Sequence, residues 1–154
     1  MTVYLAALLL GVIAGLRALT PVAAVCWAAF LGLLKLTGTP LAVLGSVIAV
    51  GIATAAAVFE FVSDKLPKTP SRKVPVQFGA RLLMGGLAGA AIGASAGVLP
   101  IGAGLGIVGA VAGTYGGAAG RGALARAFGR DLPAALLEDL VAVAGAAAIV
   151  CFLL

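Results

Sequence analysis

The chain has 154 residues, of which 63% are hydrophobic and 10% are charged, and its mean hydropathy is +1.24. A soluble domain carries about 25% charged residues, so a chain this apolar lacks the polar groups needed to cover its surface. The composition excludes a soluble globular domain and predicts one polytopic membrane domain over residues 1–154. The net charge is +5, but no cluster of Lys and Arg residues alternates with exposed aromatic residues, which argues against a nucleic-acid-binding protein.

Residues that carry chemistry are scarce. There is no histidine, and the two cysteines, Cys26 and Cys151, each lie within an apolar run. Their spacing supports neither a disulfide nor a metal site, so both are expected to be buried as small hydrophobic residues. No nucleophile elbow is present either, and we expect no enzymatic activity and no cofactor. The alternative of an enzyme that uses a divalent ion bound by carboxylates stays open, although no ligand spacing supports such a site.

Apolar runs separated by turn residues predict an all-α transmembrane bundle of about six helical segments. The first two, at residues 3–16 and 21–36, are shorter than the roughly 20 residues that a spanning helix prefers. They meet near Pro21, and the sequence there fits either a hairpin, with Thr20 capping the second helix, or one helix kinked at Pro21. The charge pattern favours the hairpin.

The third segment is predicted at about 40–66 and carries Glu60 and Asp64 in its last two turns. Prolines at 67, 70 and 75 then predict a stiff, extended connector. The remaining segments are expected at about 76–98, at 101–128, and from the Asp131–Pro133 turn to the C-terminus.

Glycines recur at helical spacing in the fourth and fifth segments. The stripes consist of Gly85, Gly89, Gly93 and Gly97, followed by Gly102, Gly106, Gly109, Gly113, Gly116 and Gly120. Small residues at this spacing let helix backbones approach closely in lipid, so we predict glycine-zipper packing in preference to a pore lining. The same extended glycine face makes a homodimer an expectation.

The charges predict a topology and a polar cluster. In an alternating six-segment arrangement, nine of the ten basic residues fall on one side, which the positive-inside rule makes cytoplasmic. Both termini then lie outside. The same arrangement gathers six charged residues, each within about two turns of the cytoplasmic helix ends: Arg17, Glu60, Asp64, Arg81, Glu138 and Asp139.

Ionisable residues inside a membrane are costly and mark candidate functional sites. We expect the four carboxylates to bind a proton, another ion or a small solute, with Arg17 and Arg81 pairing with them or meeting an anionic group. This predicts a small transporter or channel-like protein of the inner membrane. The alternative is a non-transporting scaffold or lipid-binding protein, in which the charges form inter-helix salt bridges or hold lipid headgroups.

Several short motifs together resemble a known family. They are Gly15-Leu16-Arg17 before Thr20-Pro21, Glu60 with Asp64-Lys65-Leu66-Pro67, Ser71-Arg72, Arg81 ahead of the glycine-rich helix, and Glu138-Asp139. In order and spacing they resemble the bacterial integral membrane proteins of domain-of-unknown-function family 4126. The resemblance covers essentially the whole chain. It implies a multi-helix membrane protein and points to the same polar residues, without supplying an activity.

Overall fold

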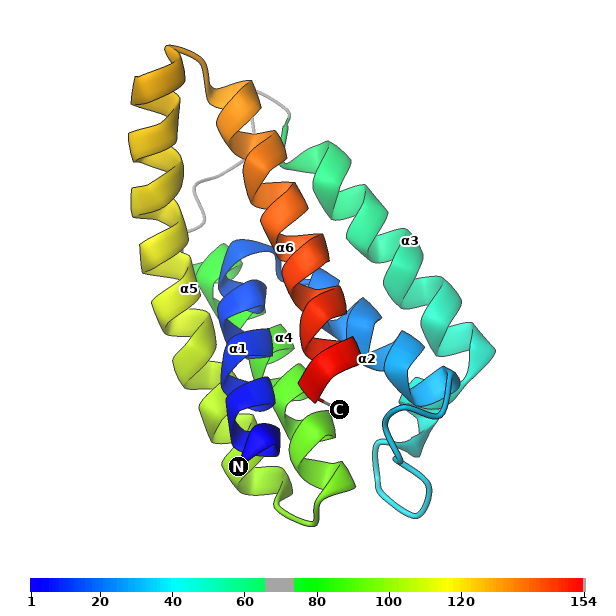
Figure 1. Cartoon of the computed structure of the whole chain (residues 1–154). Helices are drawn as coiled ribbons and strands as arrows, with labels where there is room; N and C mark the ends of the chain where they lie inside the picture. The colour runs from blue at the N-terminus through cyan, green and yellow to red at the C-terminus, as the bar shows by residue number, and fades with distance from the viewer. Residues whose placement is uncertain (66–73, 154) are drawn as a thin grey trace.

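The computed structural model of the chain describes residues 1–65 and 74–153. Within this part of the chain the fold is entirely helical and contains no strand (Figure 1). The elements are α1 (Thr2–Leu16), α2 (Thr20–Phe30), a short 3-10 helix η1 (Ala42–Gly45), α3 (Val47–Ser63), α4 (Pro75–Ser95), α5 (Leu99–Phe128) and α6 (Asp131–Leu153). The predicted all-α fold with six helical segments is confirmed.

Successive helices alternate in direction, and both termini lie toward the same end of the bundle (Figure 1). The chain reverses between α1 and α2, where Arg17 adopts an extended backbone conformation with φ −139° and ψ 114°. The first two helices therefore form a hairpin and not one kinked helix. Pro21 lies in the first turn of α2, as proline tolerates. Thr20 is the first helical residue and forms no cap bond, so the prediction that it caps the helix is wrong; Leu19 holds that position.

Two predicted boundaries are also wrong. The second segment ends at Phe30 instead of residue 36, and the third begins at Val47 instead of residue 40. Gly32 and Gly38 adopt left-handed conformations, with φ of 78° and 80°, which end the helical run. Apolar residues continue through this stretch because Leu34 and Leu36 are buried in the core of the bundle. Of the connector predicted from Pro67 to Pro75, the part at 67–73, including Ser71 and Arg72, lies outside the described residues, and Pro75 is the first residue of α4.

Three helices are long and apolar enough to cross a membrane: α4, α5 and α6, with 21, 30 and 23 residues. The other three, α1, α2 and α3, are shorter apolar helices. At 1.5 Å per residue, the 11 residues of α2 extend about 16 Å, roughly half the thickness of a bilayer core. The structure is thus that of a membrane protein with three candidate spans, beside which shorter helices pack.

Glycine allows the closest helix contacts. A Cβ atom added to Gly106 of α5 would lie 2.1 Å from the carbonyl oxygen of Gly85 of α4, and one added to Gly109 would lie 2.2 Å from that of Leu8 in α1. Gly97, by contrast, follows the end of α4. Gly116 has no neighbouring atom within 4 Å of such a Cβ. Zipper packing along the full length of both stripes therefore stays a prediction.

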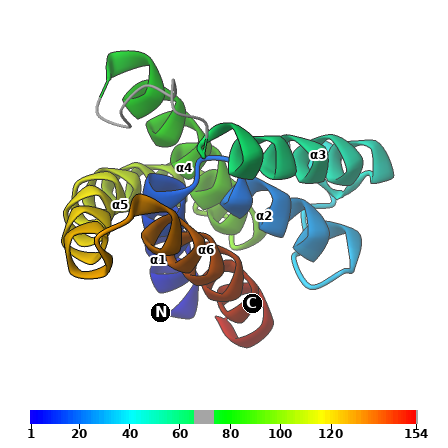
Figure 2. The same ribbon diagram turned by 90° about the horizontal axis from the view of Figure 1, so that it is seen from above.

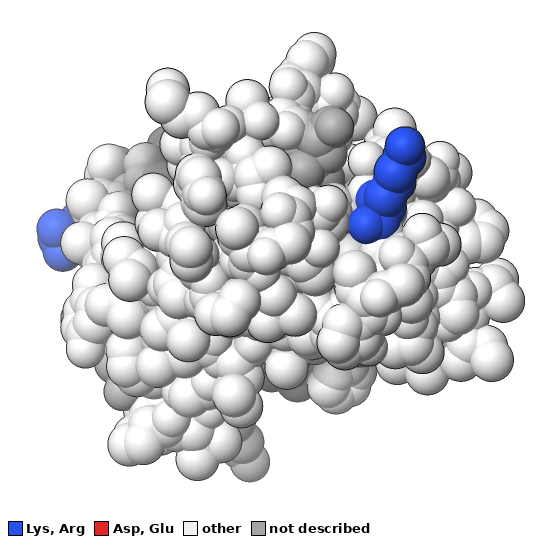
Figure 3. Space-filling model, turned by 90° about the horizontal axis from the view of Figure 1, so that it is seen from below, with Lys and Arg blue, Asp and Glu red and all other residues white. Residues whose placement is uncertain are grey.

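The bundle has a charged end and an apolar end. Viewed from below, its surface shows scattered basic side chains and no acidic ones (Figure 3). The acidic residues lie in the last turns of α3, directly after it, and in the first turns of α6, at the opposite end (Figure 1). Seen from above, α2 and α3 lie side by side, to one side of α1, α4 and α5 (Figure 2). Charge is thus gathered where the α1–α2 turn meets α3, α4 and α6.

We predict that Gly106→Ala destabilises the bundle by about 1–3 kcal/mol or more, because its methyl group would overlap backbone that cannot move without separating α4 from α5. Gly104→Ala is the matched control on the same helix. A Cβ atom there meets nothing within 4 Å, so this variant should be neutral or more stable by up to about 1 kcal/mol. Unfolding in mixed micelles measures both. Equal stability of the two variants would contradict the packing described here.

Candidate functional site

The site is built around the break between α1 and α2. The first amide groups of a helix have no partner within that helix, and inside a bilayer no water is at hand to bind them. Here the amides of Ala18 and Leu19 donate to the two oxygens of Glu60, at 2.7 and 2.9 Å. The Glu60 side chain comes from the last two turns of α3. A carboxylate in this position also meets the positive end of the α2 dipole.

On the α1 side of the break, the backbone carbonyl groups accept hydrogen bonds from a cationic side chain. Nη1 of Arg81, from the second turn of α4, donates to the backbone carbonyls of Gly15 and Leu16 at 2.9 and 2.7 Å. These carbonyls belong to the last turn of α1, the negative end of its dipole. Both charged residues are largely withdrawn from solvent, since Glu60 is 9% exposed and Arg81 2%. Two buried ionic side chains thus replace water at the broken backbone.

Further ion pairs form a chain of alternating charge beside the break. Lys65 pairs with Asp139 at 2.6 Å, Asp139 with Arg17 at 2.5 Å, Arg17 with Asp64, and Asp64 with Arg81 at 3.8 Å. Each carboxylate of this chain therefore lies between two cations. We call this set, together with Glu60, the charged cluster.

Arg17 is the centre of this cluster and is fully buried. Its guanidinium carbon lies 5.7 Å from the ring centroid of Phe61, and the ammonium of Lys65 lies 5.9 Å from the same ring. Cations over an aromatic face gain electrostatic stabilisation, more so when desolvated. Such a buried charge is tolerated only with partners, and Arg17 has them in Asp64 and Asp139.

Glu138 lies elsewhere. Its carboxylate is 3.4 Å from Nη1 of Arg121 in α5, which also binds Asp131 at 2.6 Å. Adjacent residues on a helix point about 100° apart, so Glu138 faces α5 while Asp139 faces Arg17. The sequence-based interpretation that all four acids meet at one site is therefore corrected to three acids in the charged cluster and one in a separate α5–α6 pair.

Sequence reasoning missed two participants, Lys65 and Arg121, because it counted both only among the basic residues that mark the cytoplasmic side. Because α5 continues to Phe128, Arg121 lies about two turns inside a helix. Its partners Asp131 and Glu138 are seven residues apart, a spacing that returns to the same helical face, and this was the available signal. Lys65 carried a weaker signal, as the residue directly after Asp64 at the end of α3.

The described cysteine and acidic residues form neither a metal site nor a disulfide. Among residues 1–65 and 74–153, no group of three or more His, Cys, Asp or Glu is placed to hold a metal ion. Cys26 is buried as expected, whereas Cys151 is exposed near the end of α6, so the prediction for Cys151 is wrong. An apolar side chain is well accommodated on a helix face turned toward lipid, which is why burial in protein was not required.

Over residues 4–153 the chain matches the family model described as Domain of unknown function (DUF4126). The chain belongs to this family. The resemblance inferred from the motifs around Arg17, Glu60, Asp64 and Arg81 is thereby confirmed. No curated protein and no solved structure matches the chain significantly. The comparisons accordingly assign a family without assigning an activity.

We predict that Arg81→Met costs about 3–5 kcal/mol of unfolding free energy, because it leaves two buried carbonyl groups without a donor and removes one of the two cations beside Asp64. Arg126→Met is the control, since Arg126 is exposed on α5 and forms no ion pair with a described residue. It should change stability by less than about 0.5 kcal/mol. Thermal unfolding in mild detergent compares them, and a loss of the same size in both variants would refute the stabilising role of Arg81.

Proposed function

We propose that this integral membrane protein moves a proton or small cation across the membrane and binds it at the charged cluster, with Glu60 as the binding carboxylate. The observation that carries the proposal is how Glu60 is held. Its oxygens accept from two backbone amides, and it forms no ion pair with a described residue. Asp64 and Asp139 are each held by two cations. Glu60 can therefore take up a proton without releasing a buried cation from its partner.

The surroundings of Glu60 support reversible binding. In secondary transporters, helix ends that lie inside the membrane form ion and substrate sites, and the α1–α2 hairpin likewise brings the ends of two helices together inside the bundle. The alternating chain beside it lets one ion pair open while the carboxylate keeps its second cation. Asp139 can thus loosen from Lys65, which is 26% exposed, and remain bound to Arg17.

Location and assembly complete the proposal. We place the protein in the cytoplasmic (inner) membrane with its charged end toward the cytoplasm, because basic residues are retained on that side. Membrane lipids are the surrounding partners. A homodimer, formed through the exposed small residues of the second half of α5, provides a pathway between two protomers.

A second candidate function is that of a non-transporting scaffold, and one observation favours it. Arg121 links Asp131 and Glu138 within the α5–α6 hairpin, as expected of a purely structural ion pair. If the charged cluster has the same structural role, its residues fix the relative positions of the helices and transport no ion.

Proton and monovalent-cation flux in proteoliposomes distinguishes the two functions. We expect wild-type flux and its loss in Glu60→Gln, because glutamine keeps the shape and one of the two hydrogen-bond acceptors but cannot exchange a proton. Glu138→Gln is the matched control, a buried glutamate outside the charged cluster. It should retain most of the flux.

Absence of flux in the wild type, together with a large loss of thermal stability in Glu60→Gln, would reject transport and support the scaffold. Flux that survives in Glu60→Gln would show that Glu60 is not the binding carboxylate.

A further inference from the structure

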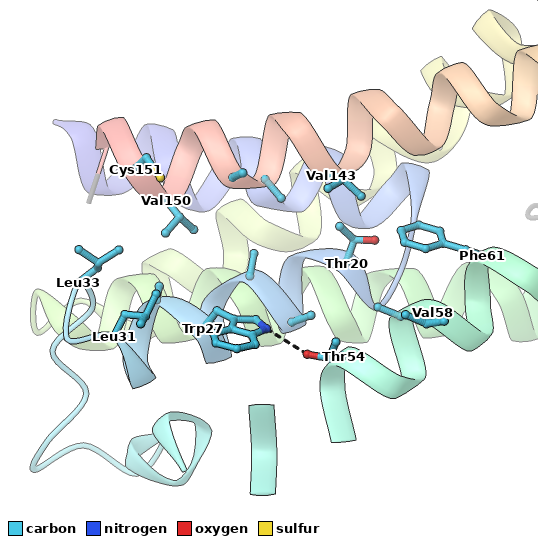
Figure 4. A pocket seen from close by; sticks show the side chains of 16 residues that line it. Thr20, Trp27, Leu31, Leu33, Thr54, Val58, Phe61, Val143, Val150 and Cys151 are labelled. Carbon is cyan, nitrogen blue, oxygen red and sulfur yellow. Dashed lines mark hydrogen bonds between the residues drawn. The ribbon is translucent and has the colours of Figure 1, made fainter. Parts of the chain in front are cut away.

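An apolar groove runs between α2, α3 and α6, apart from the charged cluster. Its volume is 380 Å³, within the range of pockets that hold small ligands. Figure 4 shows Leu33 and Cys151 toward one end and Val143, Thr20 and Phe61 toward the other. Most lining side chains are hydrocarbon, so the groove suits an apolar occupant.

One polar group in the groove lacks a partner. The hydroxyl of Thr20 has no hydrogen-bond partner among the described residues, although the residue is only 7% exposed. The carbonyl of Leu16, four residues earlier, already accepts from Arg81. The other threonine of the groove, Thr54, accepts from the indole of Trp27 at 3.0 Å (Figure 4). Because buried hydroxyls are normally hydrogen-bonded, the occupant should bring an acceptor to Thr20.

A cation lies about one helical turn after Phe61, past the end of the groove along α3. Phe61 lines the groove close to Thr20 (Figure 4). The ammonium of Lys65 lies 5.9 Å from the Phe61 ring centroid. Lys65 follows the end of α3, and its side chain is 26% exposed although it pairs with Asp139. From the groove toward the end of α3 the order is therefore a hydrocarbon wall, a hydroxyl, and a partly exposed cation.

We propose that this groove binds one acyl chain of a membrane glycerophospholipid. The hydrocarbon lies along α2 and α6, the ester carbonyl accepts from the Thr20 hydroxyl, and the phosphate meets the ammonium of Lys65. A phospholipid carries these three groups in the same order as the groove. A free fatty acid has one polar group only, which would reach either Thr20 or Lys65 and not both. The site does not depend on transport at Glu60.

Trp27 makes the groove directly observable, since it is the single tryptophan of the chain and lines the pocket. The experiment titrates phosphatidylcholine with brominated acyl chains into the purified full-length protein in mild detergent and follows quenching of tryptophan fluorescence. We expect saturation at one lipid per chain. Thr20→Val removes the hydroxyl at nearly constant shape and should weaken binding about fivefold, the value of one ordinary hydrogen bond.

Two α6 variants test the place of binding. Ala147 lines the groove and is exposed, so Ala147→Phe fills the groove without displacing the core and should abolish saturable quenching. Ala148 is also exposed but lies outside the groove, so Ala148→Phe should bind as the wild type does. Circular dichroism establishes that each variant folds, and Thr20→Val retains the test should Ala147→Phe misfold.

Three results would overturn the proposal. Quenching that rises without saturation would mean that lipid contacts Trp27 only as bulk solvent. Equal binding by the wild type and Thr20→Val would show that the Thr20 hydroxyl does not hydrogen-bond to the lipid. A brominated fatty acid that binds more tightly than the brominated phospholipid would identify the free acid as the occupant.

Discussion

The structure depends on satisfying the backbone where α1 ends and α2 begins. Neither helix is long enough to reach both membrane surfaces, so their junction falls within the bundle, where unpaired amides and carbonyls are costly. Glu60 supplies the acceptor for the amides, and Arg81 supplies the donor for the carbonyls. Each side chain also has the sign of charge that the adjoining helix dipole favours. Glu60 and Arg81, whose charges are costly to place inside a membrane, thus satisfy the backbone groups at the α1–α2 junction.

This junction organises the surrounding helices. Because Glu60 belongs to α3 and Arg81 to α4, the contacts tie the short hairpin to both of these helices. On its other side, α1 packs against α5 at distances that only glycine permits, as at Gly109. Between α2, α3 and α6 the packing is looser and leaves the apolar groove. The bundle therefore combines tight packing of α1, α4 and α5 with a groove between α2, α3 and α6.

Much of this arrangement could be predicted from sequence. Apolar runs and turn residues define the six helices, and the cost of charge in a membrane is enough to single out Arg17, Glu60, Asp64 and Arg81. The charge pattern correctly favoured a hairpin at Pro21. These features follow from local patterns and from the solvent properties of the bilayer.

The remaining details depend on packing that no local pattern records. The stretch after Phe30 is as apolar as a helix, but Gly32 and Gly38 turn it, and Leu34 and Leu36 are buried as part of a loop. Glu138 and Asp139 are neighbours in sequence, yet they face different helices because a single step turns the helix by about 100°. Deciding which of them meets Arg17 requires the relative rotation of α6, which is set by tertiary contacts alone.

The central claim is that Glu60 exchanges a proton while the other carboxylates of the charged cluster stay bound to their cations. Infrared difference spectroscopy of the protein in lipid, with a step in pH, measures this directly. We expect a protonated carboxyl band to appear on acidification of the wild type and to be absent from Glu60→Gln. If Glu60 stays ionised throughout the pH range in which the protein is folded, or if the band persists in Glu60→Gln, the claim is wrong.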